Sequence, residues 1–252
     1  NQANSSYGTA LVGTISGTSI SFGSAAIFNT ANSDTPRTVF DSNSNKIVLT
    51  YKDFANSYVG TAIVATVSGT SISFGSPVIY ENSNSGTQSM TFDSNSNKVV
   101  IAFVDAPNGA KGAAVVGTVS GTSISFGTKV IFETNGISAI SATFDSSANK
   151  VLVAYQDATN SGYGTAIVGT VSGSTISFIT KVVIENNSTA NFTTVFDSSS
   201  NKAVIVYQRS NGGINEGVGI VYKMVAGPSS YDLTSENFVG ISDGAYASGA
   251  TA

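Results

Sequence analysis

Acidic side chains recur at fixed places in this chain of 252 residues, and carboxylates are its best candidates for chemistry. One series ends an apolar stretch each time and consists of Asp53, Asp105 and Asp157, with Arg209 at the same place in the last copy. A second series follows an alternating stretch and consists of Glu81, Glu133 and Glu185, with Asn29 at the same place in the first copy. Two carboxylates can hydrolyse a glycosidic bond when they flank it. A single active site would not repeat its carboxylates in several copies, so we predict no catalytic residue and no enzyme.

The composition removes several other kinds of chemistry. The chain has no His and no Cys, which excludes a Ser/His/Asp triad, a cysteine nucleophile, a thiolate zinc site and a disulfide framework. Eleven basic and fifteen acidic residues give a net charge of -4 without a basic block, so we expect no nucleic-acid partner. The two arginines, Arg37 and Arg209, are too few for the arginine cluster of sialidase-like propellers. We predict no metal site and no cofactor. Because no apolar run reaches about 18 residues, we also predict no membrane insertion.

The clearest organisation of the chain is an internal repeat with a period of 52 residues. A Phe-Asp-Ser marker begins at Phe40, Phe92, Phe144 and Phe196. A glycine before an apolar run stands at Gly8, Gly60, Gly112 and Gly164, and a fifth copy at Gly217 comes one residue late. Self-similarity at such a period indicates stacked supersecondary units. We expect Phe92 and Phe144 of the marker to lie in the core.

Each repeat contains four stretches with the pattern of β-strands and none with the period of a helix. Val99–Val104 is a nearly unbroken apolar run, typical of an interior strand. Ser71–Tyr80 alternates apolar with small polar residues and contains Pro77, typical of an edge strand. Four-stranded units repeated about every 40–50 residues are typical of β-propeller blades. We therefore predict an all-β, propeller-like array, with a trimeric fibre of interlocked sheets and a stacked sandwich array as alternatives.

The repeat divides the chain into six parts. The predicted divisions are a half repeat at 1–30, full repeats at 31–82, 83–134 and 135–186, a degenerate last repeat at 187–225, and the start of a C-terminal module at 226–252. The missing first half of the opening blade could come from the other end of the chain or from sequence upstream. Residues 1–7 resemble the loops before Gly60 and Gly164, which favours upstream sequence.

Two kinds of connection alternate between the predicted strands. The turns DSNSNK and SGTS barely change between copies, and we expect Asp and Asn there to cap their own backbone amides rather than to form a calcium loop. The other connections, such as KDFANSYV and NTANSDTPR, differ in every copy. Loops carry recognition on rigid scaffolds. The rim that holds the variable connections, here called the variable rim, is therefore the candidate binding face.

The variable rim is rich in amides, hydroxyls, carboxylates and scattered aromatic rings, which suit sugars. The candidate ligand-binding residues are Asp53, Tyr58, Glu81, Asp105, Glu133, Asp157, Tyr163, Glu185 and Arg209. The expected partner is a host or cell-surface glycan, bound through several weak sites that gain by effective concentration. For any single residue, an ordinary solvated loop is an equally good interpretation.

The repeat sequence also resembles a known group of proteins. GTAIVGTVSG followed by TISF, together with FDSNSNKVVIAF, is similar to propeller-like repeats found in tandem in predicted proteins of marine bacteria and their phages. The segment LTSENFVGISDGAYASGATA resembles one common near the C-termini of marine phage tail-fibre and structural proteins. The resemblance implies an extracellular or virion-surface component with a role in host recognition, and it implies no catalytic residues.

These observations predict a surface-displayed, non-enzymatic binding or structural module of a phage fibre or an extracellular appendage. We expect a homo-oligomer or a part of a larger fibre. The alternative is an architectural protein whose repeats assemble edge to edge into extracellular filaments or a surface layer. Alternating strands such as Ser19–Phe28 lack the lysines that normally discourage edge pairing, which favours the alternative.

Overall fold

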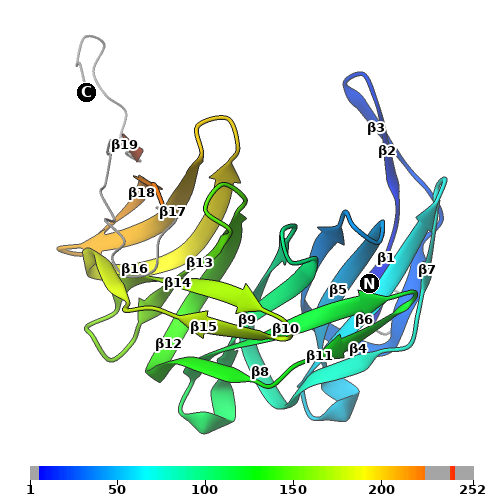
Figure 1. The fold of residues 1–252 in the computed structure, drawn as a ribbon, viewed down its shortest axis with the longest axis horizontal. Coiled ribbons are helices and arrows are strands. Elements are labelled where there is room, and N and C mark those ends of the chain that lie inside the picture. Colours follow the sequence, from blue (N-terminus) through cyan, green and yellow to red (C-terminus); the bar gives the residue numbers. More distant parts are fainter. Residues whose placement is uncertain (1–5, 225–238, 242–252) are drawn as a thin grey trace.

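The computed structural model describes residues 6–224 and 239–241, and most of them lie in antiparallel strands. Figure 1 shows groups of strands that follow one another along an arc in sequence order. Seventeen of the described strands connect into one open sheet, and β2 and β3 form a separate hairpin. No helix among the described residues is long and apolar enough to cross a bilayer.

Strands of the same kind recur in each repeat. The long strands are β4 (Ala26–Asp41), β8 (Val78–Asp93), β12 (Val130–Asp145) and β16 (Val182–Asp197). The strands after them are β5 (Lys46–Asp53), β9 (Lys98–Asp105), β13 (Lys150–Asp157) and β17 (Lys202–Asn211). The next in order are β1 (Tyr7–Ala10), β6 (Val59–Ser68), β10 (Lys111–Ser120), β14 (Tyr163–Ser172) and β18 (Ile214–Tyr222). The short strands are β2 (Gly13–Ser16), β3 (Ser19–Phe22), β7 (Ser71–Phe74), β11 (Ser123–Phe126), β15 (Thr175–Phe178) and β19 (Val239–Ile241). Two 3-10 turns are η2 (Phe54–Asn56) and η3 (Ala106–Asn108).

Each long strand belongs to two neighbouring groups of strands. The first half of β8 pairs with β6, and its second half pairs with β9. The partner changes between Asn84 and Ser85, and an irregularity in the register between Ser85 and Gln88 follows the change. We name the groups units 1 to 5. They occupy residues 6–30, 31–82, 83–134, 135–186, and 187–224 with β19.

Units 2, 3 and 4 each pair four strand segments antiparallel and in sequence order. In unit 2 these are the second half of β4, then β5, then β6, and finally β7 followed by the first half of β8 along the same edge of β6. The fold class predicted from the sequence is therefore correct at the level of an all-β antiparallel sheet. A propeller requires the units to close into a ring, and the described sheet is open, so the propeller prediction is not confirmed.

Part of the variable rim is strand rather than loop, contrary to the prediction from the sequence. The stretch NTANSDTPR lies inside β4, and its counterparts lie inside β8, β12 and β16. Thr35, Ala139 and Asn191 adopt positive φ angles of 47°, 46° and 53° at the same place in three of these strands. The polar residues therefore mark a bulge where a continuous strand changes partner, and bulges of this kind bend a strand without ending it.

The uniform turns are hairpin turns stabilised by their own side chains, as predicted. Asp41 Oδ1 accepts hydrogen bonds from the backbone N–H groups of Asn43 and Ser44, at 2.9 and 3.0 Å. Asp93 makes the same pair of bonds one repeat later. The last Asn of each turn has a φ near 55°, a conformation that Asn tolerates better than most residues. The repeated sequence therefore encodes a repeated turn.

The core consists of interfaces between neighbouring units, because alternate residues of the inner strands face opposite neighbours. Val99 and Ile101 of unit 3 pack with Val48 and Val64 of unit 2. Their chain neighbours Val100 and Ala102 pack with residues of unit 4, among them Val153. This explains the unbroken apolar run that the sequence shows in each repeat.

The burial of the Phe-Asp marker depends on the unit that precedes it. Phe144 is buried against residues of unit 3, and Phe92 is half-buried against unit 2. Phe40, by contrast, is 54% exposed. The described part of unit 1, which precedes Phe40, has only β1, β2, β3 and the first half of β4, and therefore offers less surface to cover the ring.

Neighbouring units also approach closely at their outer hairpins. A Cβ added to Gly75 would lie 1.8 Å from the carbonyl oxygen of Thr122, and a Cβ added to Gly127 would lie 1.8 Å from that of Ser174. Ile179 stands at the corresponding position of unit 4, and the turn that would face it falls at residue 226, outside the described residues. Glycine is thus required where the turn of the next unit contacts the backbone.

We predict that Gly127→Ala lowers the free energy of unfolding by about 1–3 kcal/mol, because backbone must move to admit the methyl group. Urea unfolding followed by circular dichroism measures the change. Gly13→Ala is the matched control, since its Cβ would meet the flexible end of Ile20 and since Ala65 already occupies the equivalent position in unit 2. Equal losses for both variants would contradict the proposed close approach.

Candidate functional site

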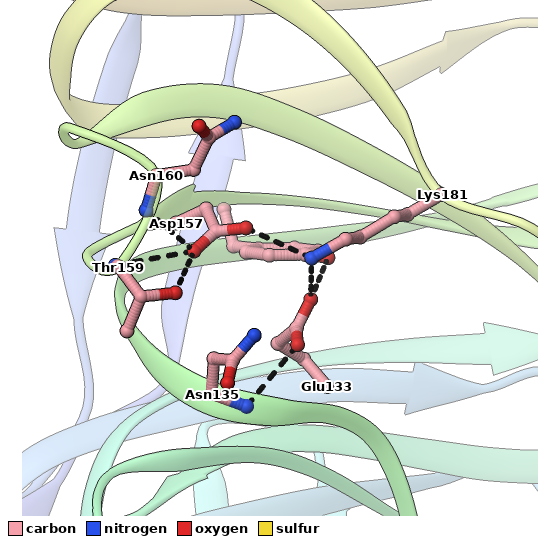
Figure 2. A network of polar contacts seen from close by, with 7 residues as sticks. Glu133, Asn135, Asp157, Thr159, Asn160 and Lys181 are labelled. Carbon is pink, nitrogen blue, oxygen red and sulfur yellow. Dashed lines mark hydrogen bonds and ion pairs between the residues drawn. The ribbon is translucent and has the colours of Figure 1, made fainter.

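Lysine side chains join the two acidic series beneath the variable rim. Lys181 Nζ contacts Asp157 Oδ2 at 2.9 Å and also bonds Glu133 Oε2 (Figure 2). One repeat earlier, Lys129 Nζ lies 2.7 Å from Glu81 Oε2 and 2.8 Å from Asp105 Oδ2. In each case the lysine directly precedes a long strand, the glutamate lies in the previous long strand, and the aspartate ends the strand between them. Three elements of two adjoining repeats are therefore held at one point.

The remaining oxygens of these carboxylates also have partners. Glu133 accepts hydrogen bonds from the Asn135 backbone N–H at 3.1 Å and from the Tyr155 hydroxyl at 3.2 Å. Asp157 Oδ1 accepts from the backbone N–H groups of Thr159 and Asn160 and from the Thr159 hydroxyl (Figure 2). A buried carboxylate is stable only when it is paired and hydrogen-bonded in this way.

Related networks lie where unit 1 meets unit 2 and where unit 4 meets unit 5. In each of them, more than one residue differs from the Lys129 and Lys181 networks. Where unit 2 has Pro77 in place of the lysine, Asn29 replaces the glutamate and donates to Asp53 Oδ1 at 3.3 Å. Where Arg209 replaces the aspartate, its guanidinium contacts Glu185 at 3.4 Å and Glu216 at 2.5 Å. Loss of one charged group is thus accompanied by loss or replacement of another.

Burial and hydrogen bonding oppose each other in setting the charge of these groups. Burial alone would raise the pKa of Asp105 and Asp157, but hydrogen bonds from the lysines and from neighbouring side chains outweigh it and hold both pKa values below the usual range. Burial would likewise lower the pKa of Lys129 and Lys181, whereas their bonds to the carboxylates raise it. The ionised forms are therefore favoured on both sides of each network.

The structure places most of the candidate ligand-binding residues inside these networks. Glu81, Asp105, Glu133 and Asp157 are buried, and Asp53, Glu185 and Arg209 are partly buried beside the polar partners named above. Their contacts give them a structural role, and their predicted role in ligand binding stays a prediction. No cluster of three or more His, Cys, Asp or Glu suited to a metal ion occurs among the described residues.

The sequence reasoning missed the lysines that complete the networks. Lys129 stands 48 residues after Glu81 and 24 residues after Asp105, and Lys181 has the same spacing to Glu133 and Asp157. The equal spacing in two repeats can be read from the sequence. It predicts a contact only when the strand topology is known, because the three residues come from different elements.

In contrast to the buried ionic networks, the exposed part of the variable rim carries aromatic side chains. Tyr58 is 44% exposed, and its ring meets that of Phe54 edge-on with centroids 4.5 Å apart. Phe54 begins η2, which is capped by Asp53 through a hydrogen bond from the Ala55 backbone N–H. Tyr163 begins β14 in unit 4, so the structure does not bring it together with Tyr58 of unit 2.

Comparisons with known proteins leave the identity of the chain open. No protein-family model and no curated protein matches it. Among solved structures, an exo-β-1,3-galactanase from Phanerochaete chrysosporium in complex with β-1,3-galactotriose is similar, with a TM-score of 0.44 and 11% sequence identity. The match covers 79% of this chain and 53% of that chain, so it spans about half the length of the enzyme. A likeness at this level carries no argument about the site.

We predict that Lys129→Ala lowers the free energy of unfolding by about 1–3 kcal/mol, because it leaves two buried carboxylates without their cation. Adding Glu81→Asn reproduces the arrangement of Asn29 and Asp53 and should restore part of the loss. Chemical unfolding of the wild type, both single variants and the double variant measures this coupling. Strictly additive effects would mean that the residues do not act as one network.

The stabilising effect of Lys129 should depend on pH at both extremes. The pKa of Asp105 is depressed, so its contribution is present above the unfolded value of about 4 and is lost as pH falls through the folded pKa. The pKa of Lys129 is raised, so its contribution is present below about 10.5 and is lost as pH rises through the folded pKa. The stability difference between wild type and Lys129→Ala, measured in urea from pH 3 to pH 11, should form a plateau that falls at both ends. A difference independent of pH would contradict this account.

Proposed function

We propose that this chain is a non-catalytic recognition module, an open propeller-like array displayed on a virion or cell surface, and that it binds glycans at its variable rim. Its polar composition with few charges suits an extracellular setting. The resemblance to tandem repeats of marine bacteria and phages makes a phage fibre or an extracellular appendage the proposed context. The ring of Tyr58 is the proposed contact for a sugar.

The conformation of Tyr58 is the observation that carries this proposal. Its φ is 64°, in a region that bulky side chains rarely adopt. The equivalent positions Ser6, Ala110 and Gly162 also have positive φ, so units 1 to 4 share this backbone shape, and among them only unit 2 places an aromatic ring on it. Residues held in such sparsely populated backbone conformations cluster at functional sites.

The surroundings of Tyr58 also suit a sugar. The Tyr58 ring is partly exposed and is supported edge-on by Phe54, and polar residues such as Asn56 stand in the same connection. Beneath the rim, the Asp53 carboxylate accepts from both Asn29 and the η2 backbone, which fixes the connection. A rigid platform reduces the entropy lost on binding.

The experiment is a printed glycan array probed with the labelled chain, followed by titration of the best-bound glycan. Tyr58→Gly should weaken binding by about tenfold or more, the equivalent of about 1.4 kcal/mol, while the fold is retained because Gly adopts the positive φ freely. Phe40→Ala is the control, since Phe40 is an exposed aromatic residue beside a uniform turn. Failure of the wild type to bind any glycan, or equal binding by Tyr58→Gly, would overturn the proposal.

A further inference from the structure

The first unit of the array exposes side chains whose equivalents in units 2 to 4 are half-buried or buried. Ile20 is 56% exposed, whereas its equivalents Ile124 and Ile176 are 3% and 2% exposed. Leu11 is 50% exposed, and its equivalents Ile63, Val115 and Ile167 are all buried. In units 3 and 4 these positions pack on the preceding unit, as Ile124 does on Val64. We call Leu11 and Ile20 the start face of the array.

The last unit exposes the complementary set of positions. Val206 is 40% exposed, although its equivalents Thr50, Ala102 and Ala154 are completely buried. Val204 and Val221 are half-buried, while Val100, Leu152 and Val168 at equivalent positions are buried. Ala203 and Ile205, which alternate with these residues, already pack on unit 4. Val204, Val206 and Val221 therefore form an end face that corresponds to the side by which units 2 to 4 contact their successors.

The start and end faces are the two halves of one interface that the chain forms repeatedly within itself. Apolar clusters join unit 2 to unit 3, unit 3 to unit 4, and unit 4 to unit 5. Figure 1 shows unit 1 and unit 5 at opposite ends of the arc, so the chain does not bring its own two faces together. Each face thus corresponds to one side of an interface that the chain already forms between its own units.

The start of the array is incomplete at its edge as well as on its face. In units 2 to 4, the strand equivalent to β1 pairs on both edges, as β6 does with β5 and with β8. Among the described residues, β1 pairs only with β4. A cavity of about 310 Å³ lies beside this strand and is lined in part by Tyr7, Gly8, Phe28 and Pro36. Within the described residues, the first unit therefore has an unpaired strand edge next to its exposed apolar side chains.

We propose that the end face of one copy of this chain packs on the start face of a second copy. The occupant is a second copy because the chain itself carries the complementary face, and because the contact continues the interface that joins its units. Such an interface is heterologous, and it produces rings when the rotation closes and filaments when it does not. This assembly does not depend on glycan recognition at the variable rim.

The test is sedimentation velocity of the full chain over two decades of concentration. The wild type should grow beyond a dimer as concentration rises. Ile20→Lys removes the start face and Val206→Glu removes the end face, so each variant alone should remain a monomer. An equal mixture of the two variants retains one intact face of each kind and should form dimers that grow no further.

Ile131→Lys is the matched control, because this position is about equally exposed in every unit from 1 to 4, at 44%, 43%, 39% and 41%. It should assemble like the wild type, and the circular dichroism spectra and unfolding midpoints of all variants show whether they fold. A monomeric wild type at every concentration would overturn the proposal. So would unchanged assembly of Ile20→Lys, or equal loss of assembly in Ile131→Lys.

Discussion

The structure depends on one constraint, that strands apolar on both faces must be covered on both faces. Both faces of the strand that contains Val99–Val104 are apolar, and exposure of either face to water is unfavourable. A unit built around such a strand therefore needs a preceding unit and a following unit to cover it. Stacking of repeats satisfies this need, and the glycines that admit the next turn allow the units to approach closely. The same constraint leaves the first and last units partly uncovered, because each lacks one neighbour within the described residues.

The ionic networks add a second kind of connection between repeats. Buried ion pairs contribute little net stability against apolar alternatives, but removal of one partner is costly. The chain follows this rule: where Pro77 replaces a lysine, Asn29 replaces a glutamate, and where Arg209 replaces an aspartate, it contacts Glu185. When one charged residue of a network is replaced, its partner is also replaced or finds another partner. This pattern is expected if an unpaired buried charge is selected against. The networks hold the rim in place, and side chains such as Tyr58 remain exposed on it.

The sequence predicted the repeat, the strands and the uniform turns because these depend on local patterns. Alternation, the unbroken apolar runs and the Asp and Asn caps all act within a few residues. It did not predict that NTANSDTPR continues a strand, because a bulge and a loop have the same polar composition. Nor did it predict that Glu81 and Asp105 share Lys129, since that contact depends on which strands adjoin. The exposure of Phe40 depends on the preceding unit, which no local pattern describes.

The measurement that tests the central claim most directly is hydrogen exchange of β3, β7 and β11 at a concentration low enough to suppress assembly. These three strands share the sequence SISF, so their intrinsic exchange rates are nearly the same and their protection reports on their neighbours. If coverage by the preceding unit decides stability, protection should rise in the order β3, β7, β11, as the burial of Ile20, Ile72 and Ile124 does. Equal protection of the three strands would contradict the account.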